Sequence, residues 1–283
     1  MISKKMTELV KRSSMIRAMF EEGNRLAKIY GKENVFDFSL GNPNMPSPPE
    51  INAAIKEIVD TEPVATLHGY MNNSGYEDVR DTVAKSINSL YGTNFSIKNI
   101  IMTVGAAGGL NVIIKSLFDE GDELVTFAPF FGEYANYAAN FNAKLVVVPA
   151  NPPTFMPDAT ALAAHITPRT KAVIINSPNN PTGVIYDEKT IKLIAATLEA
   201  KQKEYNKSIY IISDEPYREL AYDGANVPFL TKYYKNTIIG YSFSKSLSLA
   251  GERIGYLIIP SEADASADIL DAANVANRIL GFV

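Results

Sequence analysis

The sequence predicts a three-layer α/β fold, in which an open, mostly parallel sheet carries helices on both faces. Short apolar runs alternate along the chain with segments of helix length. Most of these runs are continuously apolar, which is typical of strands buried on both faces of a parallel sheet. The strands are expected at 99–104, 123–127, 144–148, 171–176, 209–213, 237–241 and 254–259.

The clearest predicted helix covers 187–204, with Asp187 as its expected N-cap. Apolar residues recur there at i, i+3, i+4 and i+7, namely Ile191, Ile194, Ala195 and Leu198. Further helices are expected at 76–90 and 106–118. The final segment, from Glu262 onward, also reads as a helix, and it stops where the chain stops. We interpret this as a sign that the chain is cut short.

The segment SLGNPNMPSPP (39–49) is rich in Gly and Pro, so no regular structure is expected in it. It divides the chain into an N-terminal helical arm, 1–45, and an α/β body, 46–283. The sequence shows no internal repeat and no low-complexity tract.

Composition narrows the possible classes of function. The 283 residues carry a formal net charge of −4 and contain no basic run, so nothing indicates nucleic acid as a partner. There is no Cys and there are only two His, so few residues are available for a Cys/His metal site or for Ser-His-Asp hydrolysis. No apolar run approaches the roughly 18 residues that a membrane-spanning helix needs. A cytoplasmic protein is therefore the default expectation.

Polar or small residues follow four of the predicted strands. They are GAAGGL (105–110), SPNNPTG (177–183), DEPY (214–217) and SFSK (242–245). In open α/β sheets, ligands bind at the carboxyl ends of the strands. The four stretches offer, in turn, a small-residue turn, an amide, a carboxylate with a phenol, and an amine.

Each of these stretches also has a purely structural interpretation. The small residues of GAAGGL allow an anion to approach a helix N-terminus, and they equally allow close helix–sheet packing. Asp214 is either a turn or N-cap residue or the counter-ion of a cationic ring nitrogen, because an unpaired buried carboxylate is costly. Asn180 fits an ordinary Pro-Thr-Gly turn. Arg253 lies between two glycines, where its guanidinium can bind an anion or point to solvent.

Lys245 is surrounded by serines and apolar residues rather than by other charges. It belongs either to an ordinary loop or to a reactive site. An unperturbed lysine is protonated at neutral pH, so a nucleophilic lysine needs desolvated or cationic surroundings. Small uncharged neighbours provide such surroundings.

Taken together, these motifs resemble the class I/II aminotransferases, which are fold-type I pyridoxal-phosphate enzymes. SFSKSLSLAGERIG is similar to their lysine motif, and NNPTG, DEPY and GAAGGL occur in the family's order. So do LGNP (40–43), YMNNSG (70–75) and PFF (129–131). The resemblance runs from about residue 30 to the end of the chain. It implies that 46–283 form the large cofactor domain and that 1–45 belong to a small domain that is otherwise missing.

The resemblance implies a role for each matching residue. Lys245 would form a Schiff base with pyridoxal 5'-phosphate and then move a proton. Asp214 would pair with the pyridine nitrogen, while Tyr217 and Asn180 would hydrogen-bond the phenolic oxygen. The remaining expected site residues are Phe131, stacked on the ring; Gly105, Ala106, Ala107, Ser242 and Arg253 around the phosphate; Tyr70, reaching the phosphate of the neighbouring subunit of a homodimer; and Gly41, near the substrate together with Asn180. No metal is expected.

The expected activity is amino-group transfer between an amino acid and a 2-oxo acid. Two alternatives remain: a C–S lyase or other β-eliminating enzyme of the same fold, and a cofactor-binding regulatory module without activity. Members of the family continue for roughly 100 further residues, about one small domain, and that region carries the arginine that binds the substrate carboxylate. The chain alone is therefore expected to have a complete cofactor site and an incomplete substrate site.

Overall fold

The computed structural model describes residues 2–37 and 41–281, and leaves the side chains of 11–17 undescribed. The chain folds into two compact units, 1–44 and 45–283. The first unit contains helix α1 (Lys4–Tyr30), capped by the Ser3 side chain, and the short 3-10 helix η1 (Lys32–Asn34). The expected helical arm is therefore present. Nowhere in the described ranges is a helix long and apolar enough to cross a membrane.

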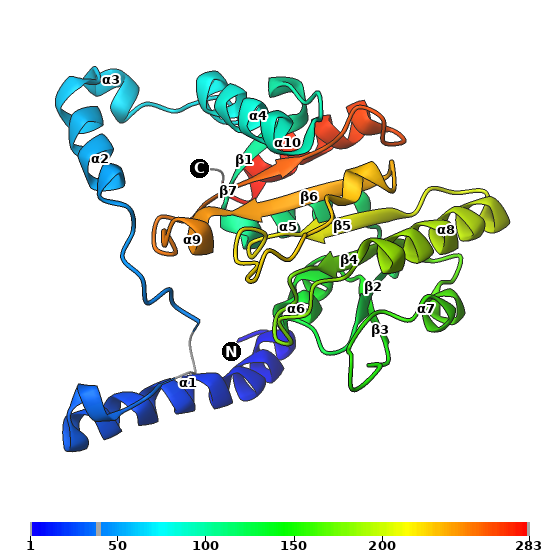
Figure 1. Cartoon of the computed structure of the whole chain (residues 1–283), viewed down its shortest axis with the longest axis horizontal. Coiled ribbons are helices and arrows are strands. Elements are labelled where there is room, and N and C mark those ends of the chain that lie inside the picture. The colour runs from blue at the N-terminus through cyan, green and yellow to red at the C-terminus, as the bar shows by residue number, and fades with distance from the viewer. Residues whose placement is uncertain (1, 38–40, 282–283) are drawn as a thin grey trace. The chain divides into compact units, whose positions relative to one another are not determined.

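The described part of the second unit is built on a sheet of seven strands in the order β1-β7-β6-β5-β4-β2-β3 (Figure 1). All neighbouring pairs are parallel except those of β7, which runs antiparallel to β1 and β6. Each strand lies within one residue of its predicted position. The strands are β1 (Ile100–Val104), β2 (Glu123–Phe127), β3 (Lys144–Val148), β4 (Thr170–Asn176), β5 (Tyr210–Asp214), β6 (Thr237–Ser242) and β7 (Ile254–Ile258).

Helices cover both faces of this sheet, which confirms the three-layer prediction. One face packs against α5 (Gly105–Leu117), α6 (Glu133–Asn140) and α10 (Ser266–Ile279). The other face packs against α7 (Ala159–His165) and α8 (Glu188–Tyr205), and near β1 against α4 (Glu77–Tyr91). Successive residues of β4 point to opposite faces, since Ile174 lies in the first cluster and Ile175 in the second. This explains why the buried strands are continuously apolar.

The helix predictions also agree with the structure. Asp187 caps α8 by accepting a hydrogen bond from the Thr190 backbone N–H at 2.7 Å. The last helix, α10, begins at Ser266 rather than at Glu262, because residues 262–265 form a turn. Of the Gly/Pro-rich segment, residues 41–48 have no regular structure, whereas Pro49 is already the first residue of a helix, a position that proline favours. The remaining elements are α2 (Pro49–Thr61), α3 (Val64–Leu67), η2 (Ile97–Asn99), η3 (Leu230–Lys232) and α9 (Phe243–Ser246).

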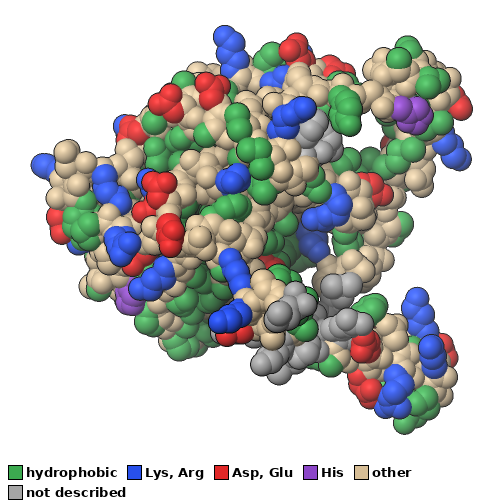
Figure 2. Space-filling view, turned by 180° about the vertical axis from the view of Figure 1, so that it is seen from behind, with side chains coloured by type: hydrophobic (Ala, Val, Ile, Leu, Met, Phe, Trp, Pro, Cys, Tyr) green, Lys and Arg blue, Asp and Glu red, His purple; other side chains and the backbone are tan. Residues whose placement is uncertain are grey.

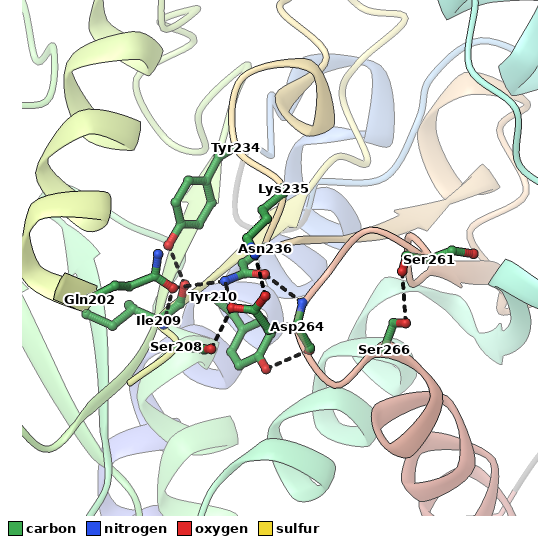
Figure 3. A network of polar contacts seen from close by, with 10 residues as sticks. All are labelled: Gln202, Ser208, Ile209, Tyr210, Tyr234, Lys235, Asn236, Ser261, Asp264 and Ser266. Atoms are coloured by element: carbon green, nitrogen blue, oxygen red, sulfur yellow. Dashed lines mark hydrogen bonds and ion pairs between the residues drawn. The ribbon is translucent and has the colours of Figure 1, made fainter. Parts of the chain in front are cut away.

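A polar network ties the turn before α10 to the amino ends of β5 and β6 (Figure 3). The Asp264 carboxylate accepts hydrogen bonds from Ser208 Oγ at 2.7 Å and Asn236 Nδ2 at 2.9 Å, and it pairs with Lys235. The Asp264 backbone carbonyl accepts a further bond from Tyr210 Oη at 2.9 Å. The hydrogen bonds from Lys235, Asn236 and Ser208 lower the pKa of Asp264 to about 2.

We expect Asp264→Asn to lower the free energy of unfolding by about 1 kcal/mol at pH 7, a value reduced for the partial exposure of this carboxylate. A depressed folded-state pKa stabilises the fold above the unfolded-state value. The deficit of the variant should therefore shrink as the pH falls below about 4. Urea unfolding at a series of pH values measures this. Glu262→Gln, an exposed change two residues away, is the control, and an equal pH profile for both variants would contradict the assignment.

Candidate active site

The sheet topology brings the predicted motifs to one edge. In the strand register, Asn176 is opposite Asp214, Asp214 is opposite Gly240, and Ser242 is opposite Gly255. Because β7 is antiparallel, its first residues lie at the same edge as the last residue of β1 and the start of α5. Figure 1 shows α9 at this end of β6. The carboxylate, the amide, the lysine and the small-residue turn therefore share one edge of the sheet.

Asp214 is buried at the end of β5, with 4% of its surface exposed. Its Oδ2 accepts a hydrogen bond from Tyr134 Oη at 2.6 Å. Its Oδ1 has no hydrogen-bond partner among the described residues. Burial raises the pKa of this carboxyl to about 7; the Tyr134 bond opposes that rise and the charge of Glu215 adds to it. The surface-turn interpretation of Asp214 is therefore wrong, and one oxygen is left for a cationic hydrogen-bond donor.

Asn180 and Tyr217, which the resemblance assigns to the same cofactor oxygen, lie in contact with each other. Asn180 Nδ2 donates to Tyr217 Oη at 3.1 Å, although the two residues are 37 positions apart in the chain. Asn176 links the two segments that carry this pair and Asp214. Its Oδ1 accepts a hydrogen bond from the Asn180 backbone N–H at 2.6 Å, and its Nδ2 donates to the Asp214 carbonyl at 2.8 Å. Burial raises the pKa of Tyr217, the Asn180 bond lowers it, and Asp214 raises it further. The phenol therefore stays protonated at neutral pH.

Lys245 lies in the single turn of α9, directly after β6. Its side chain is partly buried, and burial together with the nearby charge of Arg253 lowers its pKa. Both effects favour the neutral amine, which is the nucleophilic form. The structure thus gives Lys245 the desolvated and cationic surroundings that a reactive lysine requires.

An anion cradle forms where α5 begins. Gly105 has φ +63°, and a Cβ built on it would lie 2.9 Å from Arg253 Nη2. A Cβ on Gly255 would lie 2.8 Å from the Gly105 carbonyl carbon, so glycine is needed at both positions for this close approach. The first turn of α5, with Ala106 and Ala107, has backbone N–H groups without helical acceptors. Arg253, itself at φ +57°, supplies the positive charge beside them.

Two serines of SFSK, Ser242 and Ser244, lie at the start of α9. Ser242 Oγ caps α9 by accepting from the Ser244 backbone N–H at 3.2 Å, and it also bonds Ser244 Oγ at 2.7 Å. Ser244 Oγ is the hydroxyl within 3.5 Å of Arg253 Nη1. Ser244 therefore belongs to the cradle as well, and its place within a four-residue turn gives no signal in the sequence.

Phe131 is partly exposed, and its ring meets the Tyr134 ring edge-on with centroids 5.7 Å apart. Tyr134 is thus the support of two predicted site residues, since it contacts Phe131 and hydrogen-bonds Asp214. Tyr134 itself is not among the residues that the motifs predict. The only available signal was the spacing PFFGEY, which looks like an ordinary helix start.

Tyr70 and Gly41 are the remaining predicted site residues. The side chain of Tyr70 is 97% exposed, in the bend after α3. Gly41 belongs to the first unit, and residues 39 and 40 of its motif lie outside the described residues. Both assignments remain predictions.

The residues gathered at this edge fit pyridoxal phosphate. The free Oδ1 of Asp214 matches a protonated pyridine nitrogen, and the Asn180–Tyr217 pair matches a phenolic oxygen. The amine of Lys245 matches an aldehyde, and the cradle at Arg253 matches a phosphate.

Comparison with known proteins agrees with this fit. The family model "Aminotransferase class I and II" matches residues 33–280. An aspartate aminotransferase from Pyrococcus horikoshii is 34% identical over 277 residues, which is 97% of this chain and 66% of that protein. A probable N-acetyl-LL-diaminopimelate aminotransferase from Bacillus subtilis is 30% identical, over 81% of this chain and 56% of that protein.

Solved structures give the same answer. An aminotransferase from Eubacterium rectale superposes with a TM-score of 0.95 at 46% identity, covering all of this chain and 71% of that one. An aspartate aminotransferase from Thermus thermophilus superposes with a TM-score of 0.78 at 25% identity, over 93% and 65% of the two chains. The chain spans about two thirds or less of the length of the curated relatives described above. Enzymes of this family use pyridoxal 5'-phosphate, and the chain belongs to the class I and II aminotransferases.

Proposed function

We propose that the protein is a pyridoxal-phosphate-dependent aminotransferase, which moves an amino group between an amino acid and a 2-oxo acid. One observation carries the proposal above all: the buried Asp214 keeps an oxygen without a partner among the described residues, at the same sheet edge that presents Lys245 and Arg253. A buried carboxylate in this state needs a cation, and a protonated ring nitrogen supplies it.

When bound, pyridoxal phosphate supplies an electrophilic carbonyl and a ring that accepts electrons from the substrate's Cα. The side chains have separate tasks around it. Asp214 would stabilise the protonated ring nitrogen, and Tyr217 and Asn180 would donate hydrogen bonds to the phenolic oxygen. The phosphate would be held by Arg253, Ser242, Ser244 and the N–H groups of residues 105–107. Lys245 would bond the carbonyl carbon covalently, and its amine would accept the proton of the substrate's Cα.

We further propose that the protein acts as a cytoplasmic homodimer, in which Tyr70 reaches the phosphate site of the partner copy and Gly41 approaches the substrate. Support comes from apolar side chains exposed on α2 and α3, at the upper right of Figure 2. Ile55, Ile58, Val59 and Val64 are each about half exposed or more. Ile55, Ile58 and Val59 are three and four positions apart, so they share one face of α2, and an exposed apolar helix face of this kind supports a protein contact. In this proposal residues 1–45 belong to a small domain and 46–283 to the cofactor domain.

A spectroscopic half-reaction tests the proposed function. We expect the cofactor-loaded protein to absorb visible light, and to lose that absorption when the correct amino acid is added, with pyridoxamine phosphate and a 2-oxo acid as products. A panel of amino acids is needed, because the relatives carry names with different donors. Since the chain spans only part of those relatives, cofactor binding is measured separately from turnover.

Two results would contradict the proposal. Release of pyruvate and ammonia without any acceptor would identify a β-eliminating enzyme instead. Failure to bind pyridoxal phosphate, in protein shown to be folded by circular dichroism, would contradict both the aminotransferase and the β-eliminating activity.

A further inference from the structure

A buried ion pair, Glu215–Arg218, lies in the same chain segment as the candidate site residues Asp214 and Tyr217. Arg218 follows Tyr217, and its Nη1 donates to Glu215 Oε2 at 2.7 Å, with both side chains at most 4% exposed. The other oxygen of Glu215 accepts from Ser213 Oγ at 2.6 Å. The segment 213–218 thus presents Asp214 and Tyr217 to the site, while Glu215 and Arg218 are bound to each other.

Arg218 is also enclosed by aromatic rings. Its guanidinium carbon lies 4.5 Å from the ring centre of Tyr241, 5.5 Å from that of Tyr91 and 5.9 Å from that of Phe229. Its Nη2 donates to Tyr256 Oη at 3.1 Å. Tyr241 belongs to β6 and Tyr256 to β7, and Arg218 itself follows β5. Arg218 therefore connects β5, β6 and β7, which have predicted site residues at or beside their ends.

From Arg218 the contacts continue to the helical turn of Lys245. Arg218 Nε donates to Glu219 Oε1 at 3.3 Å, and Glu219 Oε2 accepts from Tyr241 Oη at 2.9 Å. Tyr241 Oη is also 2.7 Å from Ser246 Oγ. Because the phenol proton is donated to Glu219, the Ser246 hydroxyl donates to the phenol oxygen. Ser246 is the residue next to Lys245 in α9.

Stability alone gives little reason for such an arrangement. Burying an ion pair costs several kcal/mol of desolvation, and well-packed apolar residues often stabilise a fold equally well. A fully satisfied polar network instead fixes one geometry, because each of its members has few alternative partners. Here the fixed geometry joins the two chain segments that carry Asp214, Tyr217 and Lys245, because Glu215 and Arg218 flank the first two residues and Ser246 follows the third.

We propose that Glu215, Arg218, Glu219, Tyr241 and Ser246 form a positioning network, which holds Asp214 and Tyr217 in place relative to Lys245. This rests on the proposed function, because it assigns those three side chains to one bound cofactor. None of the five network residues needs to touch the cofactor itself. Their effect is transmitted through the backbone of 214–217 and of α9.

Tyr241→Phe is the sharpest test, because it removes only the hydroxyl that joins Glu219 to Ser246. We expect the loaded variant to fold, to shift the pH midpoint of its visible absorption by about half a unit or more, and to react with amino acids on the order of tenfold more slowly. Tyr234→Phe is the matched control. Its phenol is equally buried and bonds the Ile209 carbonyl at 2.6 Å, outside this network.

The outcomes separate the inference from the proposed function. If both variants lose similar thermal stability and keep the spectrum and rate of the original protein, the network only supports the fold and the inference is wrong. If Tyr241→Phe fails to fold, Glu219→Gln replaces it, since Glu219 is 40% exposed. The same spectral shift is expected there, and its absence overturns the inference. If the unaltered protein binds no pyridoxal phosphate, both proposals fail together.

Discussion

Replacing Lys245 by alanine is expected to lower turnover by about 10⁶-fold, the scale seen when a covalent nucleophile is removed from other enzymes. The change deletes both the amine that bonds the cofactor and the group that carries the substrate proton. Noncovalent binding should persist, because the cradle around Arg253 and the contacts of Asp214 remain. The variant should therefore still bind pyridoxal phosphate, but dialysis should remove the cofactor from it more readily than from the unaltered protein.

Borohydride reduction followed by peptide mass spectrometry checks the assignment. In the unaltered protein the label should appear on Lys245, and the alanine variant should not be labelled. Lys189→Ala, at an exposed position on α8, is the control and should behave like the original protein. A label on any other lysine would show that the reactive amine has been misidentified.

Replacing Asp214 by asparagine should produce two opposite effects. With the carboxylate gone, the pyridine nitrogen loses its ion-pair partner and its proton, and the ring becomes a poorer electron acceptor. Losing one member of a desolvated pair typically costs about 2–5 kcal/mol, or roughly 30- to several-thousand-fold. The half-reaction should slow by that factor.

Replacing Arg253 by alanine should instead mainly weaken the retention of the cofactor.

The cofactor-free protein should respond in the other direction. Burial raises the pKa of Asp214 to about 7, well above its ordinary value. A raised carboxyl pKa means that the folded state holds a proton that the unfolded state loses. The contribution of Asp214 to stability is therefore present below about pH 4 and is lost as the pH rises toward 7. Asp214→Asn should be more stable than the original cofactor-free protein at pH 8, by several kcal/mol at most.

Urea unfolding of the cofactor-free proteins at pH 5 and pH 8 measures this difference. The gain should be larger at pH 8, and saturating pyridoxal phosphate should reverse it, because only the original protein gains an ion pair. A variant that is less stable at both pH values would show that Oδ1 of Asp214 is not an unpaired acceptor. A variant with a near-normal half-reaction would show that this carboxylate does not hold the ring nitrogen.

Local patterns in the sequence were enough to locate the strands and helices and to predict candidate site residues. Mostly apolar runs located all seven strands of the described sheet, because strands buried on both faces are apolar at most positions, and even the partly exposed edge strand β3 is apolar after Lys144. Polar residues directly after those runs pointed to Asp214, Asn180 and Lys245, since the ends of parallel strands share one edge. These are local signals, which a single segment carries without its neighbours.

Which supporting side chains meet depends on the tertiary fold. Tyr134 reaches Asp214 from a helix 80 residues earlier, and Arg218 joins rings from α4, β6 and β7. Each of these residues is unremarkable within its own segment. Their contacts depend on the strand order β1-β7-β6-β5-β4 and on the register of each pair. Order and register follow from packing over the whole sheet, because the apolar face of any one strand fits several neighbours equally well.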